Sequence, residues 1–227
     1  MFGKNNNMSK TIVKLNKLKN PESFIQVNTI KGFKYVDKAG EIVNTYHKNN
    51  SAPQFQMGLS GLVIEQPKER IDELKITSQV IWARFSKIDS LDMISNLFSK
   101  EAESILKILE VEKISRVGWR NYFVHEFLNK GKQEEYLKKF TVIKGTKPST
   151  IRLEVKTSKD FNANLMIQPV IKVIKNDAEK ATGILFDIDI FQNGEIEPRN
   201  ISKLLKEFRQ YLADENGFLS VVNNTFE

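Results

Sequence analysis

The sequence predicts an α+β protein in which two main amphipathic helices pack against a mostly antiparallel sheet. Many short runs are rich in β-branched and aromatic residues and end at turn residues, which is typical of strands. Two windows, at about residues 90–110 and 199–212, instead place apolar residues at the spacing of one helix face. A chain of 227 residues suits one compact unit in which both helices cover the sheet.

The first part of the chain begins with a polar stretch rich in Lys and Asn over residues 1–20, which we expect to be a basic flexible segment. Pro21 is expected to end any structure before it. From Phe24 the pattern becomes that of a strand. Over residues 32–46 the sequence predicts a β-hairpin, because the first Asp and last Gly of D-K-A-G suit a type I turn.

The middle part contains the clearest helix. A polar connector over residues 47–54 leads to F-Q-M-G-L-S-G-L-V-I-E, which predicts one strand bent at its glycines, and Leu74–Phe85 predicts a single buried strand. Ser90 is a good N-cap for the helix that follows. The apolar face of this helix consists of Leu91, Ile94, Leu97, Phe98, Ile105, Leu106 and Leu109.

The rest of the chain predicts further strands and the second helix. Residues 133–140 favour a short helix at best, Pro169 favours a sheet edge or a bulge, and Q-N-G-E at 192–195 predicts a turn. The strands are expected at about 113–127, 151–157, 165–174 and 183–191, and the second helix face consists of Ile201, Leu204, Leu205, Phe208 and Leu212.

Polar stretches divide the chain into the basic segment 1–20 and two α+β halves, 21–143 and 144–227, which we expect to form one compact unit. Each half contains a strand, a turn and an amphipathic helix, beginning with V-I-W-A-R-F in the first and I-L-F-D-I-D-I-F in the second. This repetition predicts an internally duplicated strand–turn–helix unit, with coincidence as the alternative.

The composition narrows the chemistry. The chain has no cysteine, which excludes disulfides, thiolate metal sites and a cysteine nucleophile. No secretory signal is recognisable and no window reaches about 18 apolar residues, so we expect a cytoplasmic protein without a membrane segment. The net charge of +7 is concentrated in residues 1–50, where nine Lys face three Asp and Glu. Such a basic end attracts nucleic acid or an acidic partner, or simply keeps the surface soluble.

One stretch, Ile114–Phe127, crowds arginines, aromatic residues and a glycine into a predicted strand. Alternation places four of its residues on one face, and these are the candidate binding residues: Arg116, Gly118, Arg120 and Tyr122. Two arginines beside a glycine form a small cationic patch that a phosphate, a carboxylate or a base can approach closely. The alternative is that both arginines form structural ion pairs while Trp119 belongs to the core.

A second pair of charged residues, Asp187 and Asp189, shares one face of a later predicted strand. Two carboxylates at this spacing, with Glu195 or Glu197 nearby, suit Mg²⁺, which prefers oxygen ligands. The same carboxylates are equally suited to receive Arg116 and Arg120 from a neighbouring strand.

Other familiar sites lack support. His47 and His125 are too few for a convincing catalytic triad or zinc site, and neither a Walker loop nor G-x-G-x-x-G is present. We therefore expect no cofactor. For nucleic acid, the candidate is a basic stripe interleaved with Phe33 and Tyr35. Its lysines are Lys10, Lys14, Lys17, Lys19 and Lys34.

Four motifs follow one another along the chain: L-K-N-P-E at Leu18–Glu22, R-V-G-W-R-N-Y at Arg116–Tyr122, D-I-D-I-F at Asp187–Phe191 and the late amphipathic helix. In this order they resemble a sporadically distributed family of uncharacterised bacterial proteins, whose central motif looks like Arg-x-Gly-x-Arg-Tyr. Here Asn121 intrudes before the tyrosine, and the final helix lacks the family's His. The resemblance implies a bacterial or phage-related origin and the two-part α+β fold, but no activity.

The function expected from the sequence is therefore that of a non-enzymatic interaction or regulatory module with a protein partner. Nucleic-acid binding through the basic N-terminal region and Mg²⁺-dependent catalysis through Asp187 and Asp189 are the alternatives. The sequence does not fix the oligomeric state.

Overall fold

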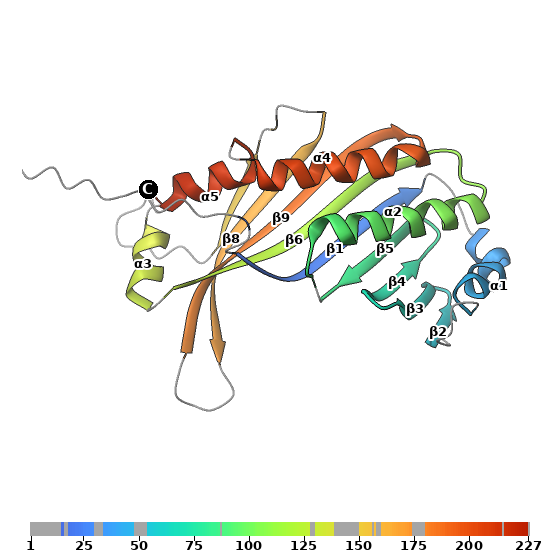
Figure 1. Ribbon diagram of the computed structural model, residues 1–227, viewed down its shortest axis with the longest axis horizontal. Coiled ribbons are helices and arrows are strands. Elements are labelled where there is room, and N and C mark those ends of the chain that lie inside the picture. The colour runs from blue at the N-terminus through green and yellow to red at the C-terminus, as the bar shows by residue number, and fades with distance from the viewer. Residues whose placement is uncertain are drawn as a thin grey trace, which may run out of the picture.

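The computed structural model describes residues 15, 18–29, 34–47, 54–86, 88–127, 130–138, 150–155, 157, 160–173, 180–214 and 216–226. A single nine-stranded sheet, antiparallel at every pairing, forms one layer, and helices cover one of its faces (Figure 1). The α+β class and the antiparallel sheet are thus confirmed. The strands are β1 (Lys19–Thr29), β2 (Gln54–Gly58), β3 (Gly61–Lys68), β4 (Ile71–Ile76), β5 (Val80–Phe85), β6 (Ile114–Phe127), β7 (Ile151–Val155), β8 (Asn162–Val173) and β9 (Lys180–Ile196).

The strands lie in the order β2-β3-β4-β5-β1-β6-β9-β8-β7, so the first of the described strands is at the centre of the sheet. Alternation along β1 buries Ile25 and Val27 under the helices and leaves Phe24 and Gln26 half-buried on the other face. Pro21 lies inside β1, at a register shift against β6, so it does not end the preceding structure as expected.

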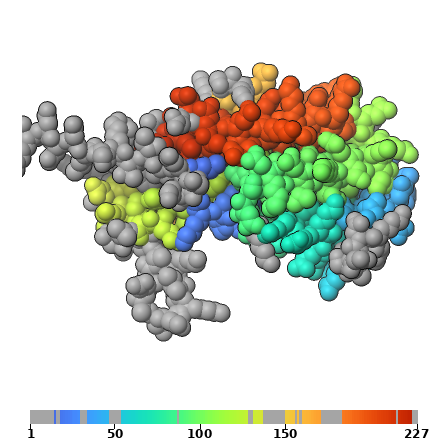
Figure 2. All heavy atoms as spheres, in the orientation of Figure 1, coloured from blue at the N-terminus to red at the C-terminus, as the bar shows by residue number. Residues whose placement is uncertain are grey.

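The helix layer consists of α2 (Leu91–Ile108), α4 (Ile201–Ala213) and α5 (Phe218–Phe226), and α2 and α4 lie side by side across the sheet (Figure 2). The two predicted amphipathic helices are confirmed as α2 and α4. Ser90 caps α2, since its hydroxyl accepts a hydrogen bond from the backbone N–H of Met93. The sequence reading missed α5, whose Phe218 stacks on Phe123 of β6 at 5.4 Å between ring centroids.

The hairpin predicted for residues 32–46 is wrong, because residues Lys34–His47 form helix α1. The true period is helical: Tyr35, Ala39, Ile42, Val43 and Tyr46 are buried on one side of the helix. The D-K-A-G sequence that suggested a turn lies within α1. Gly40 is exposed on the outer side, where a Cβ would meet no atom within 4 Å.

Two predicted single strands are in fact hairpins. The strand expected to bend at its glycines is β2 and β3, joined at Gly61, whose φ of +133° suits glycine. The run predicted as one buried strand, Leu74–Phe85, divides into β4 and β5. The reason is Thr77, whose hydroxyl accepts hydrogen bonds from the N–H groups of Gln79 and Val80 and so stabilises a turn.

In the later part, α3 (Lys130–Lys138) is the short helix that was expected, and β7, β8 and β9 match predicted strands. Pro169 on β8 pairs with β9 at a point beyond the last register pair with β7, which agrees with an edge position. The turn predicted for residues 192–195 is wrong, because β9 runs on to Ile196 and accommodates Gly194 at a φ of +127°.

Strands from both predicted halves join in this one sheet, and the proposed duplication remains a prediction. Among the described residues, no helix has the length and apolar character needed to cross a membrane.

Because of His125 on β6, we predict that the folded protein loses stability at acid pH. Burial lowers the pKa of its imidazole below 6.5, and neighbouring Glu126 opposes this only in part. The unfolded chain therefore binds the proton more readily, so the free energy of unfolding falls as the pH drops below about 6.5 and is unaffected above it.

We expect His125→Phe to reduce this loss of stability. Urea unfolding of both proteins at about pH 7.5 and about pH 5 measures it, since carboxylates that titrate in both proteins cancel in the comparison. An equal loss in both would show that His125 does not contribute.

Candidate binding face

The face of the sheet opposite α2 and α4 carries all four predicted binding residues. Along β6, Val117, Trp119 and Phe123 are buried beneath the helix layer. On the other side, Arg116, Gly118, Arg120 and Tyr122 together line a hollow. We call this side the open face, because no described helix covers it (Figure 1). Trp119 is fully buried, as the core alternative for this residue required.

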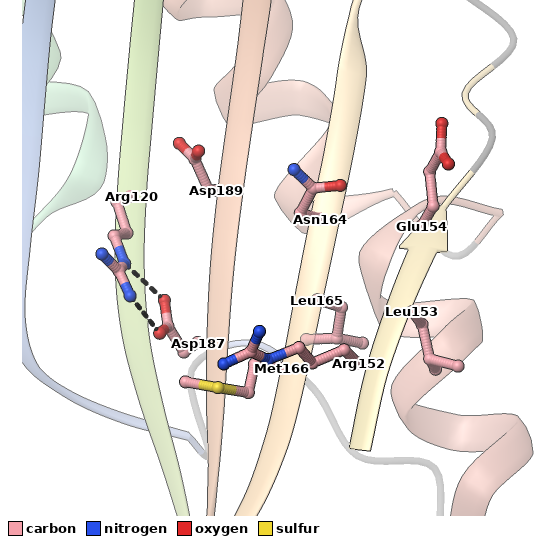
Figure 3. Close-up of a pocket in the computed structure, with 9 residues that line it drawn as sticks. All are labelled: Arg120, Arg152, Leu153, Glu154, Asn164, Leu165, Met166, Asp187 and Asp189. Carbon is pink, nitrogen blue, oxygen red and sulfur yellow. Dashed lines mark hydrogen bonds and ion pairs between the residues drawn. The ribbon is translucent and has the colours of Figure 1, made fainter. Parts of the chain in front are cut away.

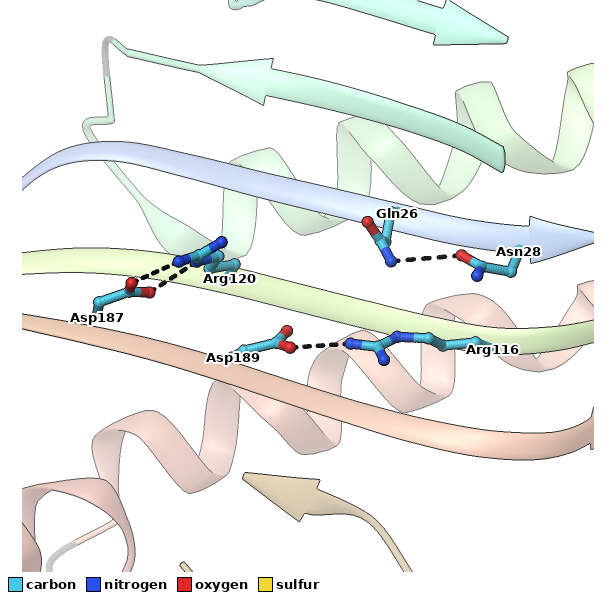
Figure 4. A network of polar contacts seen from close by, with 6 residues as sticks. All are labelled: Gln26, Asn28, Arg116, Arg120, Asp187 and Asp189. Atoms are coloured by element: carbon cyan, nitrogen blue, oxygen red, sulfur yellow. Dashed lines mark hydrogen bonds and ion pairs between the residues drawn. The ribbon is translucent and has the colours of Figure 1, made fainter. Parts of the chain in front are cut away.

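Two Arg–Asp ion pairs join β6 to β9 on the open face (Figure 4). Arg120 donates from Nε and Nη2 to the two carboxylate oxygens of Asp187, at 2.7 and 2.6 Å. Arg116 donates from Nη2 to Oδ2 of Asp189 at 2.9 Å. This is the arrangement that the sequence analysis gave as an alternative, in which Asp187 and Asp189 receive Arg116 and Arg120 from a neighbouring strand.

Gly118 lets Arg116 lie flat against the sheet. In the register, Arg120 is opposite Asp189, so the Arg116 side chain must pass over position 118 to reach that carboxylate. A Cβ on Gly118 would lie 3.2 Å from Nε of Arg116. The Arg116 guanidinium also stacks on the ring of Phe191, at 4.1 Å from its centroid. The glycine therefore serves an internal contact, because the Arg116 side chain takes the space that a larger residue would fill.

The Arg120–Asp187 pair is unevenly buried. Asp187 is only 4% exposed, whereas the Arg120 side chain is 48% exposed and its carbon Cζ lies 5.3 Å from the ring centroid of Tyr122. The hydrogen bonds to Asp187 raise the pKa of the Arg120 guanidinium, so this side chain stays charged. Burial, followed by the negative charge of Asp187, raises the pKa of the Tyr122 phenol, which therefore remains a neutral hydrogen-bonding group.

Three aromatic side chains form a stripe across the central strands: Trp82 of β5, Phe24 of β1 and Tyr122 of β6. The Phe24 ring lies 5.9 Å from that of Trp82 and 6.0 Å from that of Tyr122, in tilted and edge-to-face arrangements. All three are half-buried, so each presents part of its ring to the exterior. We call these residues the aromatic stripe.

The open face is hollowed on both sides of Arg120. The larger hollow, of about 440 Å³, lies over β6, β9, β8 and β7, and Arg152 points in it toward the Arg120–Asp187 pair (Figure 3). The smaller hollow, of about 280 Å³, lies over β5, β1 and β6. Its lining comprises Phe24, Gln26, Trp82, Arg116, Gly118, Arg120, Tyr122 and Asp189.

A buried polar chain lies on the opposite side of the same strands. The indole Nε1 of Trp119 donates to Ser23 Oγ at 2.7 Å, and Ser23 Oγ donates to Oδ1 of Asn121 at 3.0 Å. These bonds fix β1 against β6 where the aromatic stripe and both arginines are mounted. The candidate binding residues therefore project from strands whose pairing is reinforced by buried side-chain hydrogen bonds.

The structure does not gather the other predicted residues here. Lys19 and Lys34 form exposed ion pairs with Glu126 and Glu110, at the start of β1 and at the start of α1. Glu195 pairs with Lys113 and Glu197 with Arg199. Lys10, Lys14, Lys17, Phe33 and the side chain of His47 lie outside the described residues, and Tyr35 is buried.

For a metal ion, the described part of the chain contains no group of three or more His, Cys, Asp or Glu in suitable positions. Both oxygens of Asp187 and Oδ2 of Asp189 already accept hydrogen bonds from arginine. As arranged, the two carboxylates neutralise guanidinium groups.

Sequence reasoning missed Phe24, Gln26 and Trp82 as members of this face. The signal was present in the alternation of F-I-Q-V-N and V-I-W-A-R-F, but it shows only that these residues share a face within each strand. The register that places Gln26 between Trp82 and Gly118 comes from pairing of β1 with both β5 and β6.

Fold and site together define an α+β protein whose antiparallel sheet is covered on one face by helices and carries aromatic and paired charged residues on the other. Compared with protein-family models and with curated protein sequences, the chain shows no match.

Proposed function

We propose that the protein is a non-enzymatic interaction or regulatory module whose partner docks on the open face of the sheet. The observation that carries this proposal is the half-exposed aromatic stripe, held beside two internally neutralised arginines. The outer face of an antiparallel sheet is ordinarily polar. Aromatic and arginine side chains are the groups enriched at the centres of interfaces, so their gathering here favours recognition.

The charged groups also support binding over catalysis. A general base or a metal-binding carboxylate needs an available oxygen, whereas Asp187 uses both of its oxygens to hold Arg120. Mg²⁺-dependent catalysis therefore remains the less favoured hypothesis. Nucleic-acid binding remains the second candidate, because the aromatic stripe is suited to stacking even though Lys19 and Lys34 have carboxylate partners.

We also infer that the module arose by internal duplication. The order strand, helix, antiparallel meander and helix occurs from β1 to α2 and again from β6 to α4. In each case the last strand of the meander returns beside the first strand, β5 to β1 and β9 to β6, and the two first strands pair with each other. This repetition supports a duplication, and in a duplicated fold the candidate binding face lies where the two copies meet.

Site-specific photo-crosslinking in the native host tests the proposed face. A photoreactive phenylalanine derivative replaces Tyr122 on the open face in one protein, and exposed Lys206 on α4 in a control protein. We expect a specific adduct from position 122 and none from position 206. Adding Trp82→Ala to the first protein should abolish the adduct, since it removes one ring of the aromatic stripe.

Mass spectrometry of the adduct then distinguishes protein from nucleic acid. The proposal would be abandoned if position 122 gave no adduct, or if Trp82→Ala left the adduct unchanged. A cytoplasmic protein partner is what we propose the adduct to contain.

A further inference from the structure

We propose that the smaller hollow on the open face binds a nucleobase, supplied by a free nucleotide or by single-stranded nucleic acid. This inference concerns the face of the proposed function and goes beyond it, because it adds a nucleobase ligand to the face on which the protein partner docks. The hollow measures about 280 Å³, close to the lower end of small-molecule sites at roughly 300 Å³, and suits a ring system.

The walls of the hollow are flat groups. The lining includes the rings of Trp82, Phe24 and Tyr122 and the guanidinium groups of Arg116 and Arg120, with Arg120 beside the Tyr122 ring. In the register, Trp82, Gln26 and Gly118 are neighbours across β5, β1 and β6, and the side chains of Arg116 and Gln26 lie over the glycine, at 3.2 and 3.5 Å from a Cβ built there. Proteins bind unstacked bases between aromatic rings and guanidinium planes of this kind.

Hydrogen-bond donors and acceptors both lie at the edge of the hollow. Asp189 accepts from Arg116 through Oδ2, and its Oδ1 has no donor within the described part of the chain. The amide of Gln26 donates to Asn28 at 3.3 Å, which leaves its carbonyl oxygen as a second acceptor. Arg120 binds Asp187 through Nε and Nη2, so Nη1 is available as a donor. A base edge, which presents N–H donors beside ring-nitrogen and carbonyl acceptors, satisfies both kinds of group.

Charge disfavours a phosphate in the hollow, and the need for hydrogen bonds disfavours an aliphatic group. A phosphate gains little inside the hollow, because Asp189 and Asp187 neutralise the two arginines. An aliphatic group would cover Asp189 and Gln26 without offering them a hydrogen bond, which is costly. A neutral planar ring with polar edges avoids both costs. Lys75, the register neighbour of Trp82 on β4, supplies a cation for a phosphate at the rim.

Trp82 provides a direct readout. The chain has two tryptophans, and Trp119 is fully buried, so a ligand in the hollow should quench the emission of Trp82 alone. The ligands are the four common nucleoside monophosphates and single-stranded homopolymers of about ten nucleotides, a length within the range of one single-strand-binding fold. Ribose 5-phosphate and inorganic phosphate are the controls without a base.

We expect the base-bearing ligands to bind and the two controls to fail. Calorimetry with Trp82→Ala should show an affinity about tenfold lower, because a stacked base loses its aromatic partner. Gly118→Val should lower the affinity similarly by displacing the Arg116 side chain that lies over this position. Trp82→Phe keeps a ring and should retain most of the affinity, and Arg152→Ala, in the neighbouring hollow, should bind as wild type.

Binding of monophosphates identifies a free nucleotide as the source, and binding of homopolymers alone identifies single-stranded nucleic acid. The inference is overturned if no base-bearing ligand binds, or if Trp82→Ala and Gly118→Val leave the affinity unchanged. A protein adduct at position 122 without base binding would remove this inference and leave the proposed function intact. If position 122 gave no adduct and no base-bearing ligand bound, both the proposed function and this inference would be abandoned.

Discussion

Replacing Arg120 with methionine is expected to lower the free energy of unfolding by about 2–3 kcal/mol, somewhat below the roughly 3–5 kcal/mol for breaking a fully buried ion pair. The reason is the uneven burial of the pair. Arg120→Met leaves the carboxylate of Asp187, which is 4% exposed, without its two hydrogen-bond donors. Asp187→Asn leaves a guanidinium that is half-exposed and can reach water, so it should cost about 1 kcal/mol.

Urea unfolding of the two single variants measures this asymmetry. The double variant Arg120→Met with Asp187→Leu should recover most of the loss, because no unpaired charge remains. Equal losses in the two single variants would contradict the account, since the pair would then behave as an exposed ion pair.

Gly217→Ala is expected to cost about 3 kcal/mol by disturbing the junction of α4 and α5. A Cβ at this position would overlap the backbone carbonyl oxygen of Tyr211 and lie 3.0 Å from the Tyr211 ring. The chain has to shift there, and the shift withdraws Phe218 from its stack on Phe123. Thermal unfolding followed by calorimetry measures the total loss, and near-ultraviolet circular dichroism reports the aromatic packing.

Gly40→Ala is the matched control. Gly40 lies within α1 with no atom within 4 Å of a built Cβ, so alanine should stabilise the protein by about 1 kcal/mol. If both variants changed stability equally, the collision at Tyr211 would not be the cause at Gly217.

The sequence was sufficient for elements whose apolar pattern is long and unambiguous. The helix after Ser90, the helix on Ile201–Leu212 and the strand Ile114–Phe127 each bury one continuous face, so their period is readable. The short windows were less informative. In residues 34–47 a helical period and a D-K-A-G turn pattern coexist, and packing of Tyr35 and Ile42 in the core decided between them. Thr77 ended a strand through side-chain hydrogen bonds that an apolar count does not detect.

The candidate site was predictable as residues but not as an arrangement. Alternation alone placed Arg116 with Arg120 and Asp187 with Asp189. Their pairing depends on β6 and β9 being neighbours in one register, which links positions about 70 residues apart in the chain. The same is true of Trp82 and Phe24, since a strand pattern shows which residues share a face but not which strand lies next to it.

The central position of β1 also bears on how the protein is made. This strand is synthesised before both of its partners, since β5 and β6 follow at residues 80–85 and 114–127. The edge of β1 that pairs with β5 therefore stays without its native partner until residue 85 has been synthesised, and the edge that pairs with β6 until residue 127. Non-local pairing of this kind slows folding, and unpaired edges are open to association with other chains. The nascent strand β1 therefore needs protection from association with other chains until its partners have been synthesised.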